Sequence, residues 1–210
     1  MLKRFNELMK RHLSENVWTY FIIIFLFVLG VSLGALSVNG IDTDTKGEVK
    51  AYIQGFLNLS QNSEINGAGV LKQSVKFNFI YTLIIYFLGL SYLGILFTPF
   101  ITAFRGYCIG FTVAFLTESL GRGGYLLSVA SVLPQNIIIV PAIFVISVCS
   151  MNGSLIKFKN RFTRKAGGTN SYIVAYSLSI LTVFVLLLVG SLVEAYITPV
   201  FIKFVASYIS

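Results

Sequence analysis

Long apolar stretches alternate along the chain with polar segments, and they define the elements that the sequence predicts. Five of them are long enough to form a helix that crosses about 30 Å of hydrocarbon. These stretches cover residues 18–38, 77–97, 103–120, 126–150 and 172–193. The sequence therefore predicts an all-α fold: a polytopic membrane helical bundle with about five transmembrane helices.

The third stretch differs from the others because charged residues lie within it. Arg105 and Glu118 limit its charge-free part to residues 106–117, so we expect this span to be short or tilted. With these boundaries, Arg105, Glu118 and Glu194 all lie near the ends of predicted spans. The centre of the bundle is then predicted to hold no charge.

Two further segments have apolar residues at three- and four-residue spacing, which is typical of amphipathic helices at a membrane surface. The first is the cytoplasmic segment at residues 1–17, and the second lies in a long external loop at residues 39–76. The apolar face of the second helix contains Tyr52, Ile53, Phe56 and Leu57. This face is a candidate docking surface for a protein partner; the alternative is a connector whose helix closes the open side of the bundle.

Composition supports the membrane setting. Of the 210 residues, 56% are hydrophobic and 11% are charged, and the mean hydropathy is strongly positive. Because most of the chain lies in apolar spans, it has no room for a sizeable soluble domain. Residues 1–210 are therefore predicted to form a single membrane domain.

Lys and Arg residues determine the predicted orientation, because loops rich in them resist translocation. Ten of the 16 lie on the side of the N-terminus, including those of a basic cytoplasmic loop at residues 151–171, and six lie on the other side. The N-terminus is therefore predicted to be cytoplasmic and the C-terminus external, in a bacterial cell membrane. The net charge of +8 then faces anionic membrane lipids, which makes nucleic acid unnecessary as a partner.

The chain offers little that resembles a catalytic or metal site. His12 is the only histidine, and Cys108 and Cys149 belong to no Cys-x-x-Cys or Cys/His motif. The acidic residues of the 39–76 loop have no histidine near them in the sequence that could act with them in general acid–base catalysis. We therefore expect no catalytic residues, no metal, no cofactor and no enzymatic activity.

The fourth stretch carries unusual polar groups for a membrane span. Pro134 and Pro141 remove backbone donors, and Gln135 and Asn136 add side-chain amides, in a segment without charge. Lipid cannot satisfy such groups, so neighbouring helices must. One interpretation is a structural hydrogen-bond network, and the other is the polar site of a channel or transporter. Arg105 and Glu118 are secondary polar candidates, and candidate partners of the two amides are Ser128, Ser131, Asn78, Ser91 and the carbonyls that the prolines free.

Two pairs of glycines are spaced for close helix packing. Gly30 and Gly34 in the first span, and Gly106 and Gly110 in the third, each place two small residues on one helical face. Such motifs are common in membrane helices and say little about function.

Several short motifs resemble those of a known family. They are the segment His12-Leu13-Ser14-Glu15-Asn16 before the first span, Gly110-Phe111-Thr112 in the third, and Val132-Leu133-Pro134-Gln135-Asn136 with Val140-Pro141-Ala142 in the fourth. Together with the length and the five-span layout, they resemble the stage II sporulation protein M family of endospore-forming bacteria, nearly end to end. The motif around Pro134 is the most specific of them.

This resemblance implies a function in engulfment of the forespore, at the sporulation septum and the engulfing mother-cell membrane. It implies a non-enzymatic scaffold that localises two peptidoglycan-degrading partners, stage II sporulation proteins P and D. Carried over to this sequence, the family motif makes Pro134, Gln135, Asn136 and Pro141 the expected determinants of the bundle.

Overall fold

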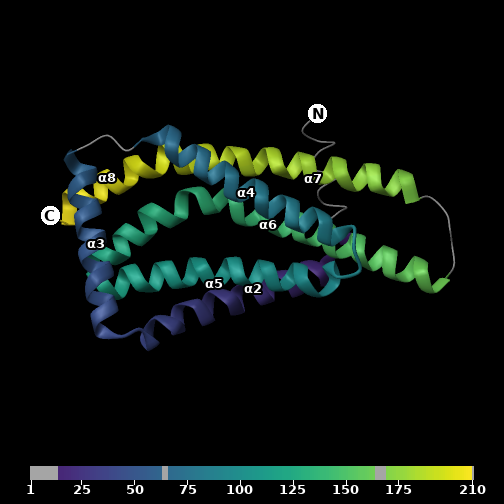
Figure 1. The fold of residues 1–210 in the computed structure, drawn as a ribbon, viewed down its shortest axis with the longest axis horizontal. Coiled ribbons are helices and arrows are strands. Elements are labelled where there is room, and N and C mark those ends of the chain that lie inside the picture. The colour runs from purple at the N-terminus through teal and green to yellow at the C-terminus, as the bar shows by residue number, and fades with distance from the viewer. Residues whose placement is uncertain (1–13, 63–65, 164–168, 210) are drawn as a thin grey trace.

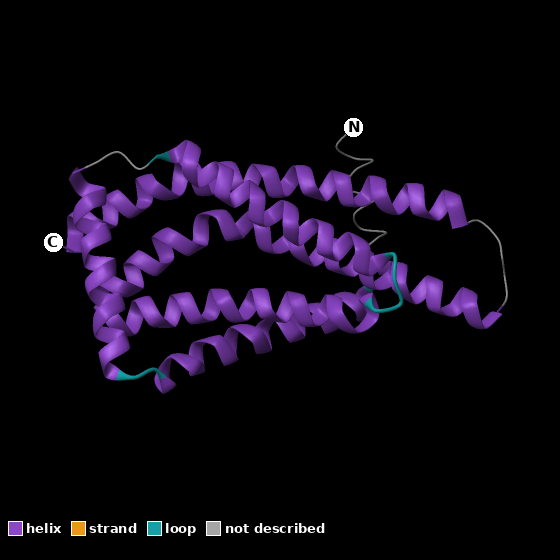
Figure 2. Cartoon of the chain, in the orientation of Figure 1, coloured by secondary structure: helices purple, strands orange, loops and turns teal. Residues whose placement is uncertain are grey.

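A computed structural model describes residues 14–62, 66–163 and 169–209, and these residues are almost entirely helical (Figures 1 and 2). The helices are α2 (Val17–Ser37), η1 (Val38–Gly40), α3 (Thr43–Asn62), α4 (Gly67–Gly89), α5 (Gly94–Leu120), α6 (Arg122–Thr163), α7 (Thr169–Leu192), η2 (Val193–Ile197) and α8 (Thr198–Ile209). The segment η2 is a turn of π-helix that continues α7 into α8. The all-α prediction is confirmed.

Five of these helices, α2, α4, α5, α6 and α7, run along the bundle, and α3 lies across one end of it (Figure 1). We call this the α3 end; α8 also finishes there and contacts α3. The opposite end, where α4 turns into α5, is called the turn end. The helices α2, α5 and α7 run from the turn end toward the α3 end, and α4 and α6 run the opposite way (Figure 1). Successive long helices are therefore antiparallel.

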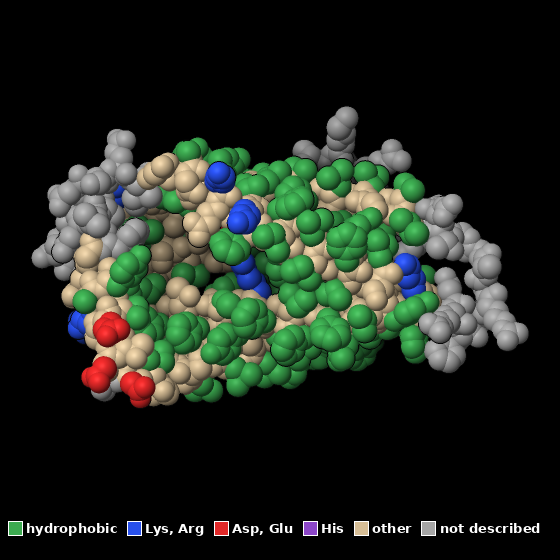
Figure 3. All heavy atoms as spheres, viewed as in Figure 1, with side chains coloured by type: hydrophobic (Ala, Val, Ile, Leu, Met, Phe, Trp, Pro, Cys, Tyr) green, Lys and Arg blue, Asp and Glu red, His purple; other side chains and the backbone are tan. Residues whose placement is uncertain are grey.

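In the described part of the chain, four helical stretches are long and apolar enough to cross a membrane, namely Val17–Gly40, Gly94–Leu120, Arg122–Lys159 and Ile173–Ser207. Their outward faces expose large hydrophobic side chains, and the view in Figure 3 is mostly apolar. The helix α4 is less apolar, because its first half contains Lys72, Gln73, Lys76 and Asn78. The chain is thus a polytopic helical membrane bundle, while a fifth crossing by α4 and the predicted orientation remain predictions.

The boundaries predicted for the second and third spans were wrong. The predicted span 77–97 runs across a tight turn, in which the Ser91 backbone N–H donates to the Leu88 carbonyl (2.9 Å) and the Leu93 N–H donates to Ser91 Oγ (3.3 Å). Mean hydropathy does not detect this turn, since Ser91 is its one strongly polar residue and leucine and tyrosine make up the rest. As a result α5 begins at Gly94 rather than at residue 103, and it is 27 residues long.

This shift changes the position of Arg105. The sequence placed it near the end of a short span, whereas it lies near the middle of α5. The prediction that the centre of the bundle holds no charge is therefore also wrong.

Other segments differ from their predicted bounds. The 39–76 loop contains the expected helix as α3, but α4 already begins at Gly67. The predicted basic loop 151–171 starts as helix, because α6 continues to Thr163, past the α4–α5 turn (Figure 1). Residues 1–13, most of the predicted amphipathic segment, lie outside the described residues.

The two glycine motifs pack against each other and bring α2 and α5 into close contact. A Cβ added at Gly30 would overlap the Ala103 carbonyl oxygen, and one at Gly106 would overlap that of Phe27. Gly34 and Gly110 are equally close to the facing backbone. Only glycine allows this approach.

Hydroxyl side chains join α6 to the α4–α5 hairpin near the turn end. Ser150 bonds to Thr98 (3.0 Å) and to the Ile85 carbonyl (2.9 Å), and Ser147 bonds to Thr102 (2.8 Å). These buried serines and threonines satisfy one another away from water, so they fix how α4 and α5 lie on α6.

Candidate functional site

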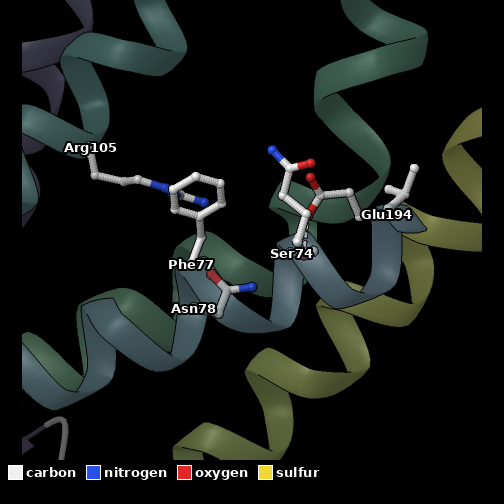
Figure 4. A pocket seen from close by; sticks show the side chains of 7 residues that line it. Ser74, Phe77, Asn78, Arg105 and Glu194 are labelled. Carbon is white, nitrogen blue, oxygen red and sulfur yellow. Dashed lines mark hydrogen bonds between the residues drawn. The ribbon is translucent and has the colours of Figure 1, made fainter. Parts of the chain in front are cut away.

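A cavity of about 310 Å³ lies between α4, α5 and η2. Seven residues line it, Val70, Gln73, Ser74, Phe77 and Asn78 from α4, Arg105 from α5, and Glu194 from η2 (Figure 4). The molecule is hollowed on this side in the space-filling view, and Lys or Arg side chains lie at the border of the hollow (Figure 3). This is a charged and polar cavity in a protein whose surface is otherwise largely apolar.

The spacing of residues in α4 explains why five of its side chains share the cavity. Positions three and four apart lie on one face of a helix, and Val70, Ser74 and Asn78 follow that rule, with Gln73 and Phe77 beside them. Ser74 and Asn78 are buried, whereas Gln73 and Phe77 are exposed. On the cavity side of α4, Ser74 and Asn78 thus face the interior of the bundle, and Gln73 and Phe77 lie at its surface.

Arg105 supplies the positive charge of the cavity. Its side chain extends from α5 toward Phe77 (Figure 4). The Nε atom is buried and has no hydrogen-bond partner within the described part of the chain. A buried donor without a partner is costly, so this atom is a natural contact for a ligand or for water.

Glu194 supplies the negative charge. Its Oε2 accepts a hydrogen bond from Ser74 Oγ (2.5 Å), and one turn further along α4 the Asn78 amide donates to Ser191 Oγ (2.9 Å). Glu194 belongs to the π-helical turn η2, a rare conformation that is frequent at functional sites. Together these bonds hold the carboxylate against α4 on the opposite side of the cavity from Arg105 (Figure 4).

The two charges do not neutralise each other. Among the described residues, no ion pair joins Arg105 to Glu194, although both line the same cavity. The site therefore presents a cation and an anion that are separated by open space, with hydroxyl and amide groups between them. This arrangement is suited to binding a polar ligand. No group of His, Cys, Asp and Glu in the described residues is arranged to hold a metal ion.

The polar motif predicted in the fourth span lies elsewhere. The Gln135 amide donates to its own helix at the Ser131 carbonyl (2.6 Å), and its Oε1 accepts from Thr198 Oγ1 in α8 (2.8 Å). The Asn136 amide donates to the Val132 carbonyl (2.7 Å), and its Oδ1 is buried without a partner in the described chain.

Within the described residues, neither amide has a hydrogen bond to the side chains suggested as partners, and neither lines the cavity. Both prolines lie within the continuous helix α6; Pro134 is half-buried and Pro141 is exposed. The motif thus acts on α6 and its contact with α8, so the structure does not bring it together with Arg105.

The other predicted residues lie at the α3 end. Glu118 forms an ion pair with Lys46 of α3 (2.6 Å), which ties α3 to α5. Ile53 packs against a small cluster that contains Leu127 and Ala206, whereas the neighbouring Tyr52 is 77% exposed. The side chains of Phe56 and Leu57 lie outside the described residues.

Sequence reasoning missed Glu194, Ser74 and Gln73 as members of one site. A signal was present, because polar residues recur at three- and four-residue spacing in α4. Glu194 is also the only acidic residue in the apolar stretch 173–207. Their association with Arg105 depends on the α4–α5 turn, which the apolar pattern hides.

Comparison with known proteins gives one match. A family model described as stage II sporulation protein M matches residues 23–199, a range that includes every residue of the cavity and the Pro134 motif. The segment His12–Asn16 lies outside the matched range. No curated protein and no solved structure matches the chain.

Proposed function

The chain belongs to the stage II sporulation protein M family, and from this we propose that it is a non-enzymatic membrane scaffold for forespore engulfment. It is a sporulation-related membrane protein by family and by its apolar helices. In the proposed role it localises peptidoglycan-degrading partners at the septal membrane and then at the engulfing mother-cell membrane. The partners that the family resemblance suggests are stage II sporulation proteins P and D.

One observation carries this proposal, the way in which α3 is attached to the bundle. The Lys46–Glu118 ion pair fixes one side of α3 to α5, and Ile53 packs on a cluster from α6 and α8. Tyr52, next to Ile53, remains exposed. A helix held at two points presents its outer face in a fixed position, which favours docking because less conformational freedom is lost on binding.

The charge distribution is consistent with an α3 end that faces the cell wall. Asp42, Asp44 and Glu48 are exposed there, and acidic side chains gather at that end in Figure 3. The extension of α6 at the turn end instead carries Lys157 and Lys159. The α3 end also holds Lys46, Lys50, Arg122 and Lys203, but the five basic residues of segment 151–171 outnumber them. Because basic residues favour the cytoplasmic side, this supports an external α3.

The helix α3 can serve both as the connector that closes the bundle and as the docking surface. Ile53 packs toward the bundle, and Tyr52 is exposed on the outside. A channel or transporter site at the fourth span has less support. The amides of Gln135 and Asn136 donate to their own helix, and neither residue lines the cavity between α4, α5 and η2.

The test is to identify the partners directly. The full-length chain, tagged at its N-terminus, is expressed in a sporulating host, cross-linked at the onset of engulfment and purified in detergent. Recovery of peptidoglycan hydrolases is the expected result. Recovery of membrane lipids alone, with normal protein levels and stalled engulfment, would contradict the scaffold role.

A further inference from the structure

We propose that the cavity between α4, α5 and η2 binds a phospholipid headgroup that carries both a phosphate and a primary ammonium, that is, phosphoethanolamine. The phosphate would contact Arg105, and the ammonium would donate to Glu194. This inference goes beyond the scaffold function and does not depend on it, because the cavity lies apart from the exposed face of α3.

The charges in the cavity select this class of ligand. A guanidinium matches phosphate oxygens with several parallel N–H donors, and the buried Nε of Arg105 has no partner among the residues that the structure describes. The Glu194 carboxylate accepts one bond from Ser74 and has further lone pairs for a donor. A simple anion would satisfy Arg105 but would be repelled by Glu194, and a simple cation would meet the opposite problem.

The separation of the two groups also fits a zwitterion. Glu194 bonds to Ser74, whereas Arg105 extends toward Phe77, almost one helical turn further along α4 (Figure 4). The cation and the anion therefore lie at different positions along α4, as the two ends of a zwitterion require, and Gln73 and Asn78 offer further hydrogen bonds in the same cavity.

The surroundings of the cavity indicate a lipid rather than a water-soluble zwitterion. Phe77 lines the cavity and is 59% exposed, so an apolar ring lies at its border. In Figure 3 hydrophobic side chains lie along the right and lower border of the hollow. An acyl chain can therefore lie along the outside of α4 and α5 while the headgroup enters the cavity.

The polar first half of α4 borders the cavity, which lies beside the middle of α5. Lys72 and Lys76 are exposed in the same turns that contribute Gln73 and Ser74. Lysines at a membrane boundary direct their ammonium groups to the interface, where lipid phosphates lie. A phospholipid can thus reach the cavity sideways from its own leaflet.

The test uses the purified full-length chain in detergent, mixed with equal amounts of phosphatidylethanolamine and phosphatidylcholine, with bound lipid measured by native mass spectrometry. The two lipids share a phosphate, but choline has no N–H to donate to Glu194. We expect the wild-type chain to retain phosphatidylethanolamine about tenfold better, the ratio that one charge-assisted hydrogen bond provides.

Two variants separate the two contacts. Glu194→Gln should reduce the preference for phosphatidylethanolamine to near unity while phosphatidylcholine binding is kept. Arg105→Gln should weaken retention of both lipids. The matched controls are Glu118→Gln and Arg122→Gln, which remove the same charges outside the cavity and should leave the wild-type ratio unchanged.

Three results would overturn the proposal. The first is equal retention of both lipids by the wild-type chain. The second is a preference for phosphatidylethanolamine that survives in Glu194→Gln; this result needs only that variant to fold, whatever happens to Arg105→Gln. The third is displacement of the lipid by soluble phosphoethanolamine at equal concentration, which would reassign the cavity to a water-soluble zwitterion.

Discussion

Thr198 donates a hydrogen bond to Gln135 Oε1 over 2.8 Å, and this bond joins the start of α8 to the proline-containing part of α6. Thr198 directly follows the π-helical turn that carries Glu194. The predicted polar motif of the fourth span and the cavity are thus separate sites, connected through a few residues of backbone between η2 and α8.

Replacing Gln135 by leucine should destabilise the bundle by about 0.6 kcal/mol, the typical value for a hydrogen bond between membrane helices. Thr198→Val should have a similar effect, because it removes the other partner of the same bond. Reversible unfolding in mixed micelles measures both. In the double variant the losses should not add; additive losses would mean that the bond contributes nothing.

Asn136→Leu should cost less than Gln135→Leu and can even stabilise the chain. The Asn136 Oδ1 atom is buried without a partner in the described residues, so leucine removes an unsatisfied acceptor along with one bond within α6. The same unfolding measurement ranks the two variants. A larger loss for Asn136→Leu would require a partner that the described residues do not include.

Gly30→Ala should destabilise the bundle by about 1–3 kcal/mol, the usual cost of overpacking a tight contact. The added methyl group would overlap the Ala103 carbonyl oxygen and force α2 away from α5. Gly55→Ala in α3 is the matched control, since a Cβ there meets nothing within 4 Å. Its helix should gain up to about 1 kcal/mol from the better helix former. Equal changes in thermal stability for both variants would contradict the glycine interface.

Tyr52→Ser should reduce recovery of the peptidoglycan hydrolases with the detergent-solubilised chain by more than about tenfold, if the tyrosine is a central contact of the kind that dominates interfaces. Membrane insertion and protein level should remain normal, because Tyr52 is exposed. Quantitative affinity capture measures the recovery. Tyr92→Ser, in the α4–α5 turn, is the control at the other end of the bundle. Unchanged recovery with Tyr52→Ser would move the docking surface away from α3.

The apolar pattern predicted the helical class and most of the long helices, because burial in lipid demands uninterrupted apolar sequence. It failed at residues 90–93, where a turn with a single strongly polar residue, Ser91, separates two helices inside a mostly apolar stretch. The error displaced the start of α5 and therefore the apparent depth of Arg105. Hydropathy averaged over a window cannot locate such a turn.

The candidate site was less predictable than the fold. Gly30 and Gly106 were visible as packing motifs, but their mutual contact depends on which helices are neighbours. The approach of Glu194 to Arg105 depends in addition on the π-helical turn η2, which has no recognisable local sequence pattern. Arg105 and Asn78 were polar candidates in the sequence, and the other polar residues of α4 and the isolated Glu194 were further indications of the cavity.

The limited apolar length of α4 has a consequence for the membrane itself. Residues 77–89 extend for about 20 Å, at about 1.5 Å per residue, which is less than the 30 Å or so of a typical hydrocarbon core. With α4 as the predicted fifth crossing, the bilayer beside it is expected to thin, while the long apolar helices α2 and α7 meet a bilayer of normal thickness. Such one-sided hydrophobic mismatch gives the protein a lower free energy where the bilayer is already thin or bent, so membrane shape alone can influence where it accumulates.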